Sequence, residues 1–80
     1  MAEVSRRDDL IEGLSGAVHD EWMAEQRRRG RTSSVGRDGE EYMVPYAQLS
    51  EAAKELDRVT VRAVLTALTR LGYAVVGVER

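Results

Sequence analysis

The sequence predicts an α+β domain that is mainly α, and three observations lead to this prediction. Apolar residues recur with helical spacing in two parts of the chain. Two short stretches are rich in β-prone residues, and a loop of glycine, serine and aspartate separates the helical parts. We expect two principal helices at about 15–29 and 58–71, a short helix at about 50–56, and short strands near 42–44 and 73–78.

The first helical pattern has a four-residue apolar spacing. Its members are Leu10, Leu14, Val18 and Trp22. Gly30 follows three arginines and suits a left-handed helix cap, while the arginines suit the negative end of the helix dipole. Gly13 and Gly16 each weaken a helix interior by about 1 kcal/mol relative to alanine. We therefore place the helix start near Ser15 and treat residues 1–14 as an N-terminal extension with some helical potential.

The second helical pattern begins after Leu49. Its first apolar stripe comprises Leu49, Ala52, Ala53 and Leu56, and its second comprises Val61, Val64, Leu65, Leu68 and Leu71. Ser50 stands where an N-cap is expected, with Glu51 in the favourable first turn. Because the two stripes are slightly out of phase, we predict two helices, with Asp57 capping the second.

The two β-prone stretches differ in strength. Pro45 forces Val44 into an extended conformation and donates no hydrogen bond, which favours a short edge strand at 42–44. The segment 73–78, "YAVVGV", is the clearer strand by composition. Two paired strands are marginally stable unless helices cover a face, and an uncovered edge would invite a second chain.

Composition limits the class of protein. Eighty residues suffice for one domain, which we place at residues 15–80, and the absence of cysteine leaves its core to packing alone. No apolar run approaches the roughly 18 residues of a membrane span, and the N-terminus lacks the apolar stretch of a signal peptide. We expect a cytoplasmic protein without a membrane segment.

Catalytic motifs are missing from the sequence. His19 is the single histidine, so a zinc site would need carboxylates alone beside it. Ser33 and Ser34 lack the Gly-x-Ser-x-Gly turn of a nucleophile, and no phosphate-binding loop is present. We predict a protein that is not an enzyme and has no metal or cofactor.

Two features could bind a partner. The aromatic residues Trp22, Tyr42, Tyr46 and Tyr73 either fill the core or form a stacking platform for a planar ligand. A basic patch comprises Arg27, Arg28, Arg29, Arg31 and Arg37. Arginines outside the helix could meet a phosphate or carboxylate, and the patch would also permit salt-sensitive nucleic-acid binding.

Several linked motifs resemble the ryanodine-receptor repeat, or RyR domain, in the family's order over roughly residues 15–76. The helix motif is similar to His19, Asp20 and Trp22; the next is similar to Met43, Val44, Pro45, Tyr46, Leu49 and Glu51. Further matching positions are Lys54, Asp57, Arg58, Leu71, Gly72 and Tyr73. Arg31 and Ser50 depart from the family, which usually has an aromatic residue and a proline there.

The resemblance implies an α+β module that has no established catalytic activity, and we expect it to act by binding. The excess of arginine over lysine and the abundance of alanine and valine are typical of GC-rich bacteria and their phages. Because the receptors carry the repeat in pairs, we expect a homodimer formed through 73–78 or the last helix. An alternative partner is a larger host or phage protein.

Kinship with bacterial relatives suggests a nucleotide-like or other anionic planar ligand. We place it at the candidate ligand residues Trp22, Arg37, Tyr46 and Lys54. The alternatives are a small nucleic-acid-associated regulator that uses the basic patch, and a structural docking module. Overall acidity makes nucleic acid the less favoured partner.

Overall fold

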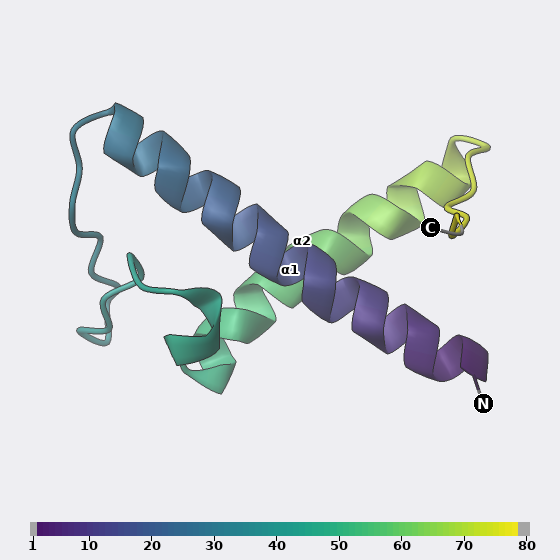
Figure 1. Ribbon diagram of the computed structural model, residues 1–80, viewed down its shortest axis with the longest axis horizontal. Helices are drawn as coiled ribbons and strands as arrows, with labels where there is room; N and C mark the ends of the chain where they lie inside the picture. The colour runs from purple at the N-terminus through teal and green to yellow at the C-terminus, as the bar shows by residue number, and fades with distance from the viewer. Residues whose placement is uncertain (1, 79–80) are drawn as a thin grey trace.

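A computed structural model describes the backbone of residues 2–78 and shows two long helices that cross (Figure 1). Helix α1 spans Ala2–Arg28, and helix α2 spans Glu51–Arg70. A single 3-10 turn, η1, covers Tyr46–Gln48 between them. Both ends of the chain lie on the same side of the cross, and the long loop closes the other side (Figure 1).

Helix α1 begins well before the predicted start near residue 15. Gly13 and Gly16 lie inside it without interrupting it. A Cβ at Gly16 would lie 3.7 Å from the Tyr46 ring, so the backbone there packs closely against η1. The proposed division of the chain into 1–14 and 15–80 remains a prediction, but no break in α1 marks it.

The predicted end of α1 is confirmed. Gly30 has φ +81°, the left-handed conformation that glycine adopts without steric cost. The Arg31 N–H donates to the carbonyl of Gln26 at 2.9 Å, and the Gly30 N–H donates to that of Arg27. These two bonds satisfy carbonyls that would otherwise lack partners at the helix end.

The prediction of two separate helices at 50–56 and 58–71 is wrong, because α2 is continuous. Ser50 is its N-cap, as predicted, and the Ser50 hydroxyl accepts from the Ala53 N–H at 3.1 Å. Asp57 lies inside the helix and caps nothing. The phase offset arises because Ala53 is buried near the loop, whereas Val61 packs against α1 further along.

The prediction of an α+β fold is also wrong: within residues 2–78 the structure has no strands and is all-α. In the loop, a single bridge joins Val35 to Glu41, and the predicted strand 42–44 forms no ladder. Over 73–78 the described backbone is likewise without strand pairing. High β-propensity cannot produce a strand where no neighbouring backbone accepts its hydrogen bonds.

A small core lies where the helices cross. Ile11 of α1 contacts Val61 and Leu65 of α2, and Leu14 and Leu68 pack against this cluster. Ser15 is fully buried, and its hydroxyl has no hydrogen-bond partner among the residues that the structure describes. No helix in the described part of the chain is long and apolar enough to cross a membrane.

Candidate functional site

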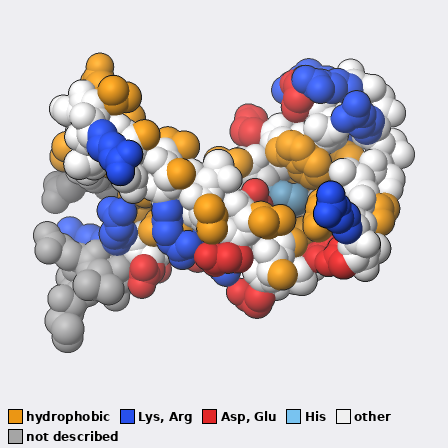
Figure 2. All heavy atoms as spheres, turned by 180° about the vertical axis from the view of Figure 1, so that it is seen from behind, with side chains coloured by type: hydrophobic (Ala, Val, Ile, Leu, Met, Phe, Trp, Pro, Cys, Tyr) orange, Lys and Arg blue, Asp and Glu red, His pale blue; other side chains and the backbone are white. Residues whose placement is uncertain are grey.

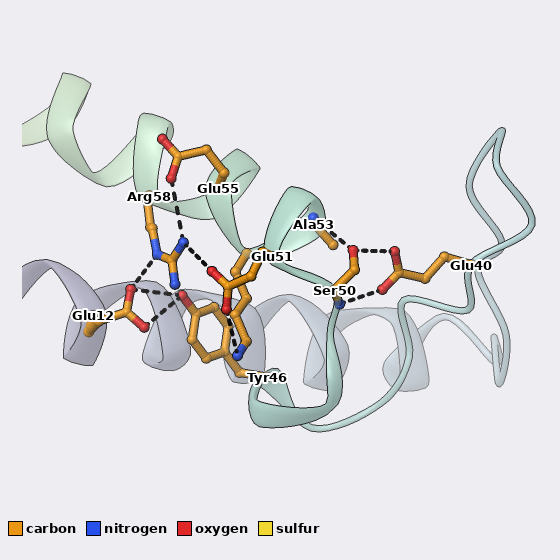
Figure 3. Close-up of polar contacts among 9 residues, drawn as sticks. Glu12, Glu40, Tyr46, Ser50, Glu51, Ala53, Glu55 and Arg58 are labelled. Atoms are coloured by element: carbon orange, nitrogen blue, oxygen red, sulfur yellow. Dashed lines mark hydrogen bonds and ion pairs between the residues drawn. The ribbon is translucent and has the colours of Figure 1, made fainter.

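An arginine on α2 joins three parts of the chain on one side of the cross. Figure 3 shows the Arg58 guanidinium directed toward Glu12 of α1 and Glu51 of α2. Its Nη1 donates to Glu51 Oε2 at 3.0 Å, and its Nε donates to Glu12. The Tyr46 hydroxyl also donates to Glu12, at 3.2 Å, so this carboxylate links α1, η1 and α2. The hydrogen bond from Arg58 lowers the pKa of Glu12, although partial desolvation opposes the change.

His19 attaches the loop to α1 from the inside of the fold. Its side chain is only 5 % exposed, and its Nε2 donates to the carbonyl of Val44 at 2.7 Å. The ring lies 5.6 Å from the Trp22 ring in a stacked arrangement and 6.2 Å from the Tyr46 ring. His19 therefore fixes the positions of both aromatic residues and of the loop that precedes η1.

A hollow of about 130 Å³ lies over this histidine, between α1, the loop and α2. Its lining comprises His19, Trp22, Tyr42, Leu49, Ala53, Leu56 and Asp57. In Figure 2 the histidine, in pale blue, is visible among orange hydrophobic side chains. The lining is mostly apolar and aromatic, and Asp57 contributes its only carboxylate.

Asp57 is partly buried beside His19. The Asp57 side chain is 26 % exposed, and its Oδ2 lies 3.7 Å from His19 Nδ1, beyond hydrogen-bond distance. Burial raises the pKa of Asp57, and the neighbouring His19 acts in the opposite direction. No hydrogen bond among residues 2–78 ends on this carboxylate, so it can still accept donors from a ligand.

The loop that carries Tyr42 is held by two carboxylates. Glu41 accepts from the N–H groups of Ser34, at 2.6 Å, and Met43, at 3.0 Å, and these hydrogen bonds together with that of the Ser33 hydroxyl lower its pKa. Glu40 accepts from the Ser50 hydroxyl at 2.6 Å, which joins the loop to the start of α2 (Figure 3). Tyr42 is thereby held at the edge of the hollow.

The structure brings two of the four candidate ligand residues together, Tyr46 and Lys54, and places Trp22 in the hollow and Arg37 in the loop. Trp22 lines the hollow, whereas Tyr46 contacts His19 but does not line it. Lys54 already contacts two groups of the chain: its Nζ lies 5.6 Å from the centre of the Tyr46 ring and 3.6 Å from the Glu51 carboxylate. Arg37 lies exposed in the loop. A single ligand site made of all four is not formed in this structure.

Three arginines of the basic patch are engaged by their neighbours. Arg28 and Arg29 both bond the carboxylate of Glu25, at 2.6 and 3.0 Å, and their hydrogen bonds lower its pKa. Arg31 donates to the side chain of Gln26 at 2.9 Å. These pairs lie at or next to the end of α1, where the sequence placed positive charge for structural reasons.

The sequence did not identify Tyr42, Leu56 and Asp57 as neighbours around His19. Ala53 and Asp57 are four residues apart and share a face of α2, and this spacing could have indicated their association. The predicted break at residue 57 concealed the spacing, because a capping residue lies outside the helix. Among the described residues no group of acidic, histidine or cysteine side chains is arranged to hold a metal ion.

The described residues form a small all-α module of two crossed helices with a hollow beside the crossing. A family model, that of the RyR domain, matches residues 4–77, so the chain belongs to the RyR domain family. The resemblance in the motifs around His19 and Pro45 is thereby confirmed. Searches of curated proteins and of solved structures find no match.

Proposed function

We propose that this chain is a non-enzymatic binding module that holds a partner protein through the hollow over His19. The observation that carries this proposal is a preformed apolar hollow with aromatic walls at the surface. Its volume of about 130 Å³ is below the roughly 300 Å³ at which pockets for complete small molecules begin. A hollow of this size suits one anchoring side chain of a larger partner, and such anchors contribute most of the energy of many interfaces.

The rim of the hollow offers an exposed residue for a test. Leu56 lines the hollow but is 63 % exposed, so Leu56→Lys adds a long charged side chain at the rim and leaves the buried core intact. Val64 is similarly exposed on the same helix, is absent from the lining, and provides the matched control Val64→Lys. A partner would be captured on the immobilised chain from the source organism, purified, and titrated against all three proteins.

We expect Leu56→Lys to weaken the binding of the purified partner roughly 30-fold, because a long charged side chain at the rim obstructs the entry of the anchoring side chain. Val64→Lys should bind it as the unsubstituted chain does. Equal affinities of the two variants would contradict the proposal, because the partner would then bind elsewhere. Circular dichroism of both variants checks that α2 is preserved.

A nucleotide-like ligand is a second candidate, although the hollow has room only for its base and would leave the ribose and phosphate outside. The aromatic face of Trp22 could stack on a base, and Asp57 could accept from an exocyclic amino group. An anionic phosphate would have to lie away from Asp57, in reach of a loop arginine such as Arg37. Adenosine monophosphate at about 1 mM should then alter Trp22 fluorescence, whereas an unchanged signal would exclude this candidate.

Self-association is a further part of the proposal. Exposed apolar residues gather where α2 ends: Leu71, Tyr73, Val75, Val76 and Val78. A groove of about 760 Å³ lies beside them, between the first half of α1 and the last turns of α2. A second copy of the chain would remove these side chains from water, which is the usual outcome for a large exposed apolar patch.

A further inference from the structure

The hollow over His19 contains a carboxylate that pairs with no lysine or arginine among the described side chains. In that part of the chain neither lysine nor arginine lines the hollow, and the charged group within 4 Å of Asp57 is His19, when that ring is protonated. A partly buried carboxylate without hydrogen bonds loses water without receiving a donor in exchange. A ligand with N–H donors and a positive charge would supply both the missing hydrogen bonds and the missing countercharge of Asp57.

The walls of the hollow restrict the shape of that ligand. Trp22 and Tyr42 present aromatic surface, and Leu49 and Ala53 present apolar surface. An ammonium group is strongly hydrated and makes poor use of such walls, whereas a guanidinium is planar, weakly hydrated and stacks on aromatic rings. Its parallel N–H groups also match the two oxygens of a carboxylate.

We propose that the anchoring side chain is an arginine of the partner protein, whose guanidinium stacks against Trp22 and donates to Asp57. This inference rests on the binding function proposed above and adds the chemical class of the anchor. The small volume of the hollow fits one such side chain, and the negative charge disfavours a phosphate in its place. The surface therefore selects basic segments with an exposed arginine.

The experiment uses single capped amino acids as probes. N-acetyl-arginine methylamide is compared with the corresponding citrulline compound, which keeps the planar shape but is neutral, and with the lysine compound. Trp22 is the only tryptophan, so its indole N–H gives one identifiable signal in a proton–nitrogen correlation spectrum. Binding of each probe to the full chain is measured from the shift of this signal.

The charge of Asp57 is tested with a matched pair of variants. Asp57→Asn removes the negative charge from the hollow at nearly constant volume. Asp20→Asn removes the same charge from an exposed position beside His19 that does not line the hollow. Because the arginine and citrulline probes are also compared on the unsubstituted chain, the test remains decisive if Asp57→Asn does not fold.

We expect capped arginine to bind at least roughly tenfold more tightly than capped citrulline, as hydrogen bonds to a charged group imply. Asp57→Asn should abolish this preference, and Asp20→Asn should retain it. Equal binding of arginine and citrulline, or a preference for lysine or adenosine monophosphate, would overturn the arginine assignment.

Different results would contradict the arginine anchor and the proposed binding function. If no capped residue shifts the Trp22 signal while Leu56→Lys still weakens the binding of the purified partner, the arginine anchor is wrong and the binding function stands. If Leu56→Lys binds the partner normally while capped arginine still binds in the hollow, the site is right and the partner uses another surface.

Discussion

The two sides of the helical cross are held together by different forces. On the loop side, hydrogen bonds and ion pairs connect α1, η1 and α2, and the hollow over His19 lies between α1, the loop and α2. On the side where the chain ends, apolar side chains of α2 and of residues 71–78 are exposed (Figure 2). The small core at Ile11, Val61 and Leu65 lies between the two sides.

This difference indicates how a chain of 80 residues divides its stabilising contacts. Polar contacts fix the loop in one geometry but contribute modestly to stability, because water competes for exposed groups. Burial of apolar surface contributes most, and here it occurs both at the crossing, in the cluster of Ile11, Val61 and Leu65, and toward the loop, at Met23, Leu49 and Ala53. The loop side is consequently suited to specific recognition, and the other side still has apolar surface to bury.

The largest effect should come from a cavity at the crossing. Leu65 is 8 % exposed and contacts α1, so Leu65→Ala should lower the free energy of unfolding by about 2–5 kcal/mol. Leu71→Ala makes the same chemical change at a residue that is 73 % exposed, and it should alter stability by less than about 0.5 kcal/mol. Urea unfolding followed by circular dichroism measures both values.

Equal losses for the two leucine variants would show that the exposed end contributes to the core as much as the crossing does. The division between the two sides of the molecule would then be wrong. A shared loss would also suggest that a second copy covers Leu71 under the conditions of the measurement.

A smaller loss of stability should follow acidification, because it protonates the carboxylates of the ion pairs on the loop side. Arg58 lowers the pKa of Glu12 and Glu51 below their ordinary value of 4.5. A carboxylate with a lowered pKa in the folded state stabilises that state above 4.5, and this contribution is lost as the pH falls through the folded-state pKa. The melting temperature should therefore fall below about pH 4.5.

Arg58→Gln separates these pairs from other acidic groups. Without the guanidinium, the folded-state pKa of Glu12 returns toward 4.5, so the fall in melting temperature on acidification should be shallower. Arg37→Gln removes an exposed charge from the loop and should leave the acid profile unchanged. Asp57 has a raised pKa and contributes with the opposite sign, in both variants alike. Identical profiles for Arg58→Gln and the unsubstituted chain would contradict this account.

Local signals predicted the helix ends but not the continuity of the helices. Gly30 and Ser50 were identified correctly, because capping depends on residues adjacent to each end. The helix boundaries predicted at residues 15 and 57 were wrong, because both helices are continuous there. Packing against Tyr46 and across the core compensates for the weak local helix preference. The segment 73–78 was assigned as a strand from composition, but strand formation depends on a neighbouring strand, and residues 2–78 contain none.

The candidate site was predictable in part. Trp22 was identified because aromatic residues are frequent at binding surfaces. Tyr46 and Lys54 were proposed as ligand residues, but Tyr46 bonds Glu12 and Lys54 lies beside Glu51. Asp57 was assigned to capping. Its proximity to His19 arises from the packing of α2 against α1, which no local sequence pattern predicts.

The smallest effect on the fold, and the most direct test of the exposed side, concerns self-association. If a second copy covers the apolar end, light scattering at high micromolar concentration should report a dimer. Val76 is 76 % exposed and lines the groove together with Arg6 and Arg7. Val76→Lys therefore adds a positive charge next to these arginines, and repulsion between like charges should separate the dimer into monomers. Val35→Lys adds the same charge to a 60 % exposed residue of the loop and should leave the dimer intact. A monomeric unsubstituted chain would mean that the exposed side is tolerated alone, and a dimer broken by Val35→Lys would place self-association on the side of the hollow.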